Sequence, residues 1–217
     1  MGETGAAPGL SAVYVARHGQ TLSNLRRRYS GSSPEPLTAA GRDQAALLAD
    51  RLGEIGIAEL WSSEIARAAE TARIVGERLG VPVLPDPRLN EMVMGSWEGR
   101  TEDEIASADG EAYRTWLLEP DRLVLPGRET LAQVASRVFP AIEDAAAAGH
   151  RVLLVSHVAP IRVAVLVVLG IPLSSYKRLA VRNGECLRLD IRSALAERLD
   201  GPRPVSLRNE LTGARTA

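Results

Sequence analysis

The chain has 217 residues, a net charge of −1 and 45% hydrophobic residues, which is typical of one medium-sized globular domain. Its charge gives no basis for binding a nucleic acid or an anionic membrane, and its longest apolar stretch, residues 161–169, is too short to span a bilayer. The single cysteine, Cys186, excludes an internal disulfide and a cysteine-based zinc knuckle. Because the first ten residues show no secretory signal, we expect a cytoplasmic protein without nucleic-acid or membrane partners.

Hydrophobic spacing and turn residues predict strands that alternate with helices along most of the chain. We expect a flexible N-terminus at 1–10, a single domain at 11–192 and a polar, mobile tail at 193–217. The expected elements are strands at 12–16, 57–61, 151–157, 176–181 and 186–191, helices at 38–55, 64–79, 130–148 and 161–169, one or two helices at 101–118, and an extended link at 82–87.

Two of the three histidines follow predicted strands. His18 comes after the strand at 12–16, and His157 ends the segment RVLLVSH at 151–157. Alternating strands and helices favour a mainly parallel sheet that is covered on both faces, and ligands bind outside the carboxyl ends of such strands. We therefore expect His18 and His157 to lie at that edge of the sheet.

The segment Arg17-His18-Gly19 has the features of a nucleophile beside an anion-binding group. Imidazole has an unperturbed pKa of about 6.5, and the charge of Arg17 disfavours protonation of His18. A neutral imidazole can act as a nucleophile, Arg17 can bind the anion presented to it, and Gly19 lets the backbone approach closely. The alternative is a histidine that only satisfies hydrogen bonds at a strand end.

Three further residues are candidates for the same chemistry. Arg67 follows a predicted strand, and its guanidinium matches phosphate oxygens. Glu91 stands in a segment of low charge, where a raised pKa would suit a general acid. His157, as an imidazolium, would stabilise charge on transferring oxygens. Taken alone, Arg67 is more simply a solvated helix residue, and Glu91 a surface glutamate.

Taken together and in order, six segments resemble the histidine phosphatase superfamily, also called phosphoglycerate mutase-like. The resemblance covers roughly residues 12–191. The segments are Arg17-His18-Gly19 with Thr21 and Asn24, PLTAAGRDQA at 36–45, SSEIARAAETA at 62–72, LNE at 89–91 with GSWEG at 95–99, PGRETLAQVASRV at 126–138, and SHVAPIR at 156–162.

The resemblance implies a three-layer α/β/α sandwich around a mainly parallel sheet, and phosphoryl transfer through a phosphohistidine. It implies that His18 attacks phosphorus, and that Glu91 protonates the leaving alkoxide and then activates water. No cofactor and no metal are implied. The residues implied to hold the phosphoryl group are Arg17, Arg67 and His157, with Asn24 beside them.

The chain departs from the family near the expected phosphate site. Ser30 replaces a glutamine that is frequent before the glycine at position 31, and Val158-Ala159 stand where the family often has two glycines. Val158 is expected to narrow the pocket. In the run 26–28, Arg28 is our candidate for an anionic part of the substrate, against the alternative of a solvated arginine run. The residues assigned to substrate binding are Thr21, Asn24, Arg28, Ser30, Gly31 and Val158.

Within this family the main alternatives are a phosphatase and a mutase. A mutase must keep water from its phosphoenzyme, whereas a phosphatase admits water. Asn90-Glu91 is reminiscent of the mutases, but Met92-Val93-Met94 follows where mutases have basic and aromatic residues. We predict a phosphatase acting on a small phosphorylated metabolite. A catalytically silent binding protein is the third hypothesis, and the complete set of candidate catalytic residues argues against it. The sequence decides neither the substrate nor whether the chain forms a homodimer.

Overall fold

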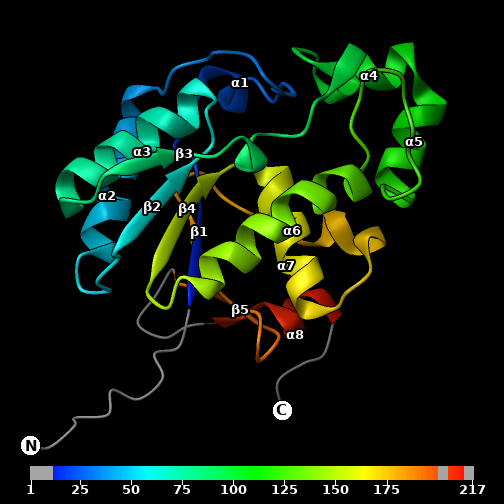
Figure 1. Ribbon diagram of the computed structural model, residues 1–217. Coiled ribbons are helices and arrows are strands. Elements are labelled where there is room, and N and C mark those ends of the chain that lie inside the picture. Colours follow the sequence, from blue (N-terminus) through cyan, green and yellow to red (C-terminus); the bar gives the residue numbers. More distant parts are fainter. Residues whose placement is uncertain (1–11, 200–204, 213–217) are drawn as a thin grey trace, which may run out of the picture.

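A twisted β-sheet forms the centre of the molecule (Figure 1). The computed structural model describes residues 12–199 and 205–212, and within these ranges seven strands form one sheet. The strands are β1 (Val13–Arg17), β2 (Glu59–Ser62), β3 (Val83–Pro85), β4 (Val152–Ser156), β5 (Cys186–Asp190), β6 (Leu195–Arg198) and β7 (Val205–Ser206). Their order is β3-β2-β4-β1-β5-β6-β7. The first four are parallel, and β5, β6 and β7 pair antiparallel.

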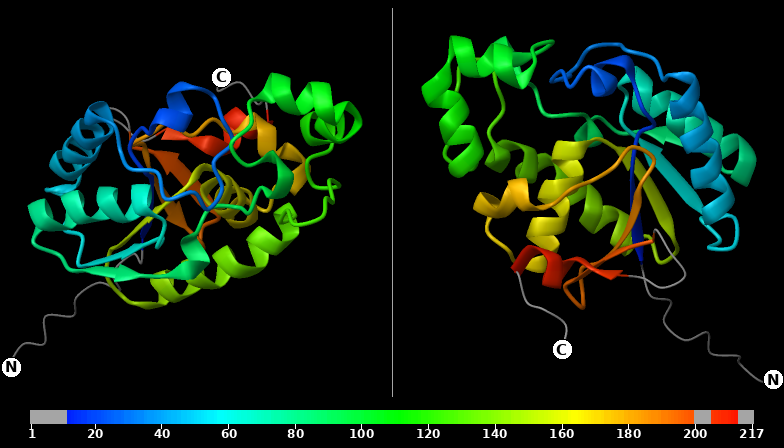
Figure 2. Two further views of the ribbon diagram at one scale, coloured as in Figure 1. Left: turned by 90° about the horizontal axis from the view of Figure 1, so that it is seen from above. Right: turned by 180° about the vertical axis from the view of Figure 1, so that it is seen from behind.

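Helices cover both faces of this sheet. Their bounds are α1 (Leu22–Leu25), α2 (Ala39–Leu52), α3 (Ala66–Leu79), α4 (Glu102–Ala108), α5 (Gly110–Leu118), α6 (Leu131–Ala147), α7 (Val158–Leu169) and α8 (Leu207–Thr212), with short 3-10 helices η1 (Pro87–Leu89), η2 (Gly95–Trp97) and η3 (Leu173–Arg178). The sheet lies between the pair α2 and α3 and the pair α6 and α7 (Figure 2). This arrangement confirms the predicted three-layer α/β/α fold.

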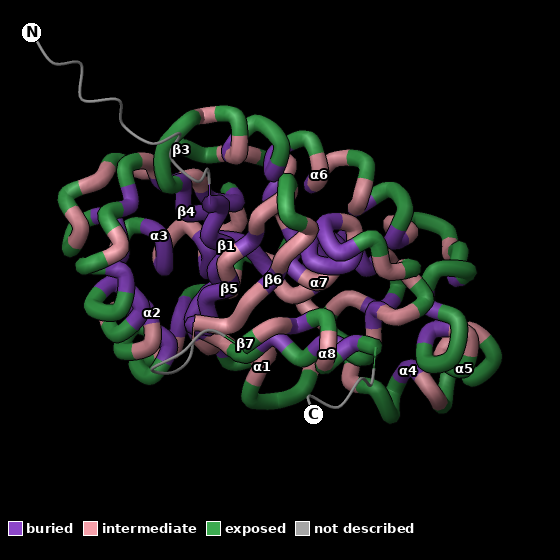
Figure 3. Tube along the Cα trace, turned by 90° about the horizontal axis from the view of Figure 1, so that it is seen from below, coloured by how far each residue is buried: buried purple, intermediate pink, exposed green. Residues whose placement is uncertain are grey.

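Strand β1 contributes to the cores on both faces of the sheet. Tyr14 and Ala16 pack with the buried residues of α2 and α3, whereas Val13 and Val15 pack with those of α6 and α7. Successive side chains of a strand point to opposite faces, so a strand covered on both sides is apolar at every position. Buried residues are accordingly concentrated in the sheet and in α7 (Figure 3).

Local capping sets the beginnings of several helices. The Thr38 hydroxyl accepts a hydrogen bond from the Gly41 N–H at the start of α2. Helices α4 and α6 begin with capping boxes at Thr101 and Thr130. The segment 101–118 forms two helices, α4 and α5. With α1, these two helices lie near the carboxyl ends of the parallel strands (Figure 1).

Expectations for three segments were wrong. The extended link at 82–87 contains the edge strand β3, where a proline is tolerated. No strand forms at 176–181: residues 176–178 are the end of η3, and residues 179–181 have no regular secondary structure.

The expected mobile tail after 192 instead adds β6 and β7 to the sheet, and α8 buries Leu207 and Leu211. The apolar residues of this segment are too few to show a period. The N-terminus at 1–10 and parts of the expected tail, 200–204 and 213–217, lie outside the described residues. No helix within the described ranges is long and apolar enough to cross a membrane.

Candidate active site

The two predicted catalytic histidines lie side by side at the carboxyl ends of neighbouring strands. Strands β1 and β4 are parallel partners, with Arg17 opposite Ser156, so the next residue of each strand reaches the same edge of the sheet. The ring centroids of His18 and His157 are 5.0 Å apart. Both side chains are almost completely buried. The position expected from the alternation of strands and helices is therefore confirmed.

Hydrogen bonds fix which ring nitrogen of His18 is available for attack. Nδ1 lies 2.7 Å from the Gly19 carbonyl oxygen, which can only accept, so Nδ1 carries the proton and Nε2 keeps its lone pair. Arg67 Nε donates to this lone pair over 3.2 Å. Burial lowers the pKa of His18 well below its usual range, and the charges of Arg17 and Arg67 lower it further. His18 is thus a neutral imidazole with a nucleophilic Nε2.

Two glycines bring the loop after β1 close to the first turn of α2. A Cβ atom on Gly19 would clash with the Gly41 carbonyl oxygen, and one on Gly41 would clash with the Gln20 carbonyl oxygen. The Gly19 N–H donates to the Thr71 hydroxyl over 3.0 Å. The backbone at Gly19 therefore approaches the backbone of α2 closely, as expected. This contact fixes the Gly19 carbonyl group, which orients His18.

A chain of hydrogen bonds fixes the tautomer of His157. The Glu64 N–H, which can only donate, reaches Asn90 Oδ1 over 2.9 Å. The Ser63 hydroxyl donates its only proton to the same oxygen over 2.8 Å. Ser63 Oγ must then accept from the Ile65 N–H, at 3.1 Å, and from His157 Nε2, at 2.8 Å. Nε2 of His157 therefore carries a proton, and only Nδ1 can gain or lose one.

His157 is neutral unless an anion lies beside it. Burial lowers the pKa of His157 well below its usual range, with further lowering by Arg67, His18 and Arg17. Its buried Nδ1 has no hydrogen-bond partner among the described residues. Without a bound anion, the protein's own charges oppose the imidazolium form that was expected from the sequence; its formation beside a phosphoryl group stays a prediction. An anion against Nδ1 would favour it.

Arg67 is held by the backbone of the loop before α2. It is the second residue of α3 and is fully buried. Its Nη2 donates to the carbonyl oxygens of Gly31, at 2.8 Å, and Ser30, at 3.2 Å, and its Nη1 to that of Ser33, at 3.1 Å. Ser30 and Gly31, which we expected to bind substrate, thus use their carbonyl groups to aim Arg67 at His18.

Arg17 brings a second guanidinium to the histidine pair. Its Nη1 donates to the Val181 carbonyl oxygen over 2.7 Å, and its buried Nε has no partner among the residues described. Burial lowers the pKa of Arg17 to about 10, so the side chain is still charged at neutral pH. Arg17 is therefore free to donate to an anion at His18.

Glu91 is a buried carboxyl group in the same cavity as His18. Burial raises the pKa of Glu91, against the opposing effect of Arg67 and Arg17. Its Oε1 accepts from the backbone N–H groups of Met92, at 2.8 Å, and Ala159, at 3.3 Å. The shift has the direction expected from the sequence, and it favours the protonated carboxyl group that a general acid requires.

Arg137 on α6 positions the backbone that carries Glu91. It donates to the carbonyl oxygens of Asn90, at 2.7 Å, Arg88, at 2.8 Å, and Glu91, at 3.2 Å, while Glu129 pairs with it at 2.9 Å. Arg137 was not among the residues predicted from the sequence. Its place in the family segment 126–138 was the one available signal.

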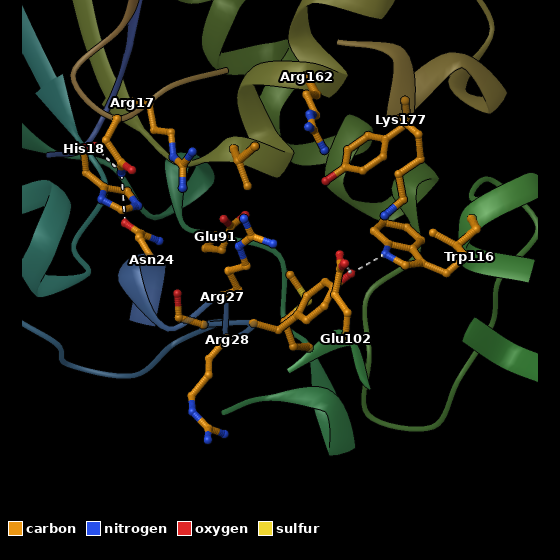
Figure 4. Close-up of a pocket in the computed structure, with 17 residues that line it drawn as sticks. Arg17, His18, Asn24, Arg27, Arg28, Glu91, Glu102, Trp116, Arg162 and Lys177 are labelled. Carbon is orange, nitrogen blue, oxygen red and sulfur yellow. Dashed lines mark hydrogen bonds between the residues drawn. The ribbon is translucent and has the colours of Figure 1, made fainter. Parts of the chain in front are cut away.

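A cavity of about 610 Å³ opens in front of these groups (Figure 4). Of the predicted site residues it is lined by Arg17, His18, Asn24, Arg28, Ser30, Glu91 and Val158. Arg67 and His157 are not among the lining residues but lie next to His18, which does line the cavity. Within the described ranges, no three histidine, cysteine or acidic side chains are grouped so that they could hold a metal ion.

The family model described as the histidine phosphatase superfamily (branch 1) matches residues 13–197. The chain belongs to this enzyme superfamily. A relative named probable phosphoglycerate mutase GpmB, from Enterobacter sp. (strain 638), is 36% identical over 180 residues, which are 82% of this chain and 84% of the relative. The protein of the same name from Yersinia pestis (strain Pestoides F) is 33% identical over the same shares.

Solved structures of this superfamily are similar over most of their length. A mycobacterial glucosyl-3-phosphoglycerate phosphatase, solved with VO3, has a TM-score of 0.75 and 29% identity, with 82% of this chain and 90% of that one covered. An α-ribazole phosphatase from Shigella flexneri has a TM-score of 0.75 and 30% identity, with 85% and 93% covered.

Thr21 and Asn24 were both assigned to substrate binding from the sequence, but their positions in the structure differ in function. The Thr21 N–H donates to Asn24 Oδ1 over 3.1 Å, and its hydroxyl accepts from the Asn24 N–H over 3.3 Å, so Thr21 positions Asn24. Asn183, which was not predicted from the sequence, donates from Nδ2 to Asn24 Oδ1, at 2.9 Å, and to the His18 carbonyl oxygen, at 3.1 Å. With its amide oxygen occupied, Asn24 offers Nδ2 to an anion in the cavity.

Arg28 does not take the orientation that we expected. Its Nη1 donates to the Gly99 carbonyl over 2.6 Å and pairs with Glu104 at 3.0 Å, and in Figure 4 its side chain points away from the cavity. Arg27, which has a left-handed backbone with φ of 51°, points into it instead. The effect of Val158 on the width of the pocket stays a prediction.

Proposed function

We propose that this histidine phosphatase superfamily member is a phosphatase that hydrolyses a small phosphomonoester through a phosphohistidine. The observation that carries the proposal is the hydrogen bonding of His18: Nδ1 is held as a donor by Gly19, so the lone pair of Nε2 faces the cationic group of Arg67. A neutral nucleophile beside fixed guanidinium groups suits attack on a phosphoryl group, which needs positioning and charge neutralisation more than covalent help.

In the first step the phosphoryl group lies against Arg17, Arg67 and Asn24, and His157 donates from Nδ1 as an imidazolium. Arg67 Nε transfers its hydrogen bond from His18 Nε2 to a phosphoryl oxygen, and the freed lone pair of Nε2 forms a bond to phosphorus as the ester P–O bond breaks. The leaving oxygen takes the proton of Glu91, whose raised pKa keeps that proton available.

In the second step the carboxylate of Glu91 takes a proton from water as the water oxygen attacks phosphorus. The P–N bond breaks, its electrons return to His18 Nε2, and inorganic phosphate leaves. Two arginines and an imidazolium supply the positive charge throughout, so we propose a reaction that needs no metal and withstands a chelator. The substrate is a phosphorylated metabolite of the cytoplasm, with no nucleic acid or membrane involved.

A mutase is the second candidate, because the relatives at 36% and 33% identity are named probable phosphoglycerate mutases. The names of the solved relatives, both phosphatases, support hydrolysis. Incubation with 3-phosphoglycerate, with and without the bisphosphate primer, separates the two. We expect release of inorganic phosphate from a panel of phosphomonoesters. Faster formation of 2-phosphoglycerate than of phosphate would overturn the phosphatase assignment.

The nucleophile is tested by trapping the intermediate. Acid-labile, base-stable phosphate should attach to the protein during turnover, and His18→Ala should abolish both this label and phosphate release. The matched control is His150→Ala, since His150 precedes β4 and pairs with Glu59 at 2.9 Å, away from the cavity. Unchanged turnover in His18→Ala would refute the mechanism.

A further inference from the structure

The outer part of the cavity, on the side opposite His18 and Asn24, is cationic and aromatic (Figure 4). Arg162 from α7 and Lys177 from η3 line this side, together with Trp116 and Tyr176, and Arg27 reaches into the cavity from the segment after α1. None of these residues takes part in the proposed chemistry at His18, so they are available to bind another part of the substrate.

The three cations lack acidic partners in the part of the chain that is described. No ion pair joins Arg27, Arg162 or Lys177 to a carboxylate there, although most other arginines with a described partner pair with one. The buried Nε of Arg162 has no hydrogen-bond partner among the described residues. A cation placed in a pocket without a partner is costly unless an anion joins it.

Aromatic rings hold two of these cations in place of acids. The Lys177 ammonium lies 4.2 Å from the Trp116 ring centroid, and the Arg162 guanidinium 4.9 Å from that of Tyr176. The Trp116 indole N–H donates to the Tyr29 hydroxyl over 3.0 Å, which fixes the ring. A ring face attracts a cation without using up its N–H donors. Arg162 also lies within hydrogen-bonding reach of the Tyr176 hydroxyl, but its Nε keeps a donor for a ligand.

One carboxylate lines this part of the cavity. Glu102 accepts a hydrogen bond from the Tyr29 hydroxyl over 3.4 Å, and it lies near enough to Lys177 to favour the charged ammonium. Burial and the charge of Arg162 outweigh this effect and lower the pKa of Lys177 to about 8. Glu91 is the second carboxylate of the cavity lining, and the five cations of the lining outnumber these two carboxylates. The excess of positive charge is available to an anion other than the phosphoryl group at Arg17 and Arg67.

We propose that the substrate carries a second anionic group, a carboxylate or a further phosphate, that binds to Arg162 and Lys177 with Arg27 on the facing wall. The proposal rests on the proposed function, since the phosphoryl end of the same molecule lies at His18. The middle of the substrate then lies along the aromatic wall of Trp116 and Tyr176. The ligand class is a phosphomonoester with anions at both ends.

The test uses homologous pairs of esters that differ only in the second charge. The ω-carboxyalkyl phosphates with two to six carbons are compared with the alkyl phosphates of the same length, and an alkanediol bisphosphate series forms the second arm. We expect kcat/KM to be roughly tenfold or more higher for the best charged ester than for its uncharged partner, as for a charge-assisted contact. The arm with the greater preference identifies the carboxylate or the phosphate.

Variants assign the preference to these residues. The preference ratio is kcat/KM for the charged ester divided by kcat/KM for its uncharged partner. Lys177→Met and Arg162→Leu should each lower this ratio roughly tenfold, whereas Lys177→Arg should keep most of the preference of the parent. The matched control is Arg114→Leu, because Arg114 on α5 is exposed and does not line the cavity. This variant should have the same preference ratio as the parent. Circular dichroism and thermal unfolding identify a variant that has lost its fold.

The outcomes separate this inference from the proposed function. Phosphate release from all esters at equal kcat/KM would overturn the second anion site and leave the phosphatase intact. Release from none would overturn the phosphatase. In that case calorimetric affinities for the same ester pairs still measure the preference, and equal affinities would also overturn the second site.

Discussion

The hydroxyl of Ser63 is predicted to set the protonation chemistry of His157 without touching the substrate. Ser63 is fully buried and accepts from His157 Nε2 while it donates to Asn90. This arrangement keeps a proton on Nε2, so Nδ1 can donate to a phosphoryl oxygen only after the ring takes up a second proton. Ser63→Ala removes that constraint, because the neutral ring is then free to carry its proton on Nδ1.

The magnitude follows from the bonds that are lost. The substitution removes the acceptor of His157 Nε2 and of the Ile65 N–H, at a cost in stability of about 1–3 kcal/mol for each donor left unsatisfied. During turnover the lost bond is one to an imidazolium, worth about 1.5–3 kcal/mol. We therefore expect kcat/KM to fall roughly 10- to 150-fold.

The decisive assay is calorimetric titration with sulfate at pH 7.5 in buffers of different ionisation enthalpy. Sulfate does not titrate near this pH, so proton uptake reports on the protein. We expect the parent to take up about one proton more per sulfate bound than Ser63→Ala does. Ser62→Ala is the matched control, since that buried hydroxyl donates to the Ser63 carbonyl over 2.9 Å and contacts neither histidine. The reasoning would be refuted if Ser63→Ala lost stability but had the same kcat/KM and the same proton uptake as Ser62→Ala.

Four further predictions follow from the same geometry. Glu91→Gln should slow phosphoenzyme formation from an alkyl phosphate about 10²- to 10⁴-fold. It should hardly change the rate with p-nitrophenyl phosphate, because that leaving group needs no proton. If rapid-quench rates fell equally for both esters, Glu91 would not be the general acid. For alkyl esters this rate in the parent should also fall as the pH rises through the raised pKa of Glu91, because the protonated form is lost. Preference for esters with a second anion should fall as the pH rises through about 8, where Lys177 loses its proton, and a flat preference ratio would exclude a role for this ammonium. Gly41→Ala should lower the free energy of unfolding by about 3 kcal/mol or more in urea titrations, because the added Cβ meets the Gln20 carbonyl oxygen. Gly53→Ala, at the end of α2 with φ of −54°, should change this free energy by less than about 1 kcal/mol. Equal losses of stability in the two variants would contradict the close packing at Gly41.

The strands and the reactive residues at their ends were predictable because their signals are local. β1 and β4 are buried on both faces, so each is an uninterrupted apolar run, and the residue after each run must lie at the carboxyl edge of the sheet. Arg17 and Arg67 flank the same edge for the same reason. Segments whose burial depends on a few separated residues gave no such signal. Tyr176 in η3 and Leu207 in α8 are examples.

The sequence alone determined the parallel sheet, the family and the five candidate reactive residues, because strand periodicity and short motifs are properties of neighbouring residues. Only the tertiary structure decided the protonation states and directions within the site. The tautomer of His157 depends on Ser63 and Asn90, and the free amide of Asn24 depends on Asn183, 159 residues away. Arg27 and Arg28 are adjacent and chemically identical, yet the turn after α1 directs one into the cavity and the other to Glu104. Such choices depend on which distant groups meet in space, and a pattern along the chain does not record that.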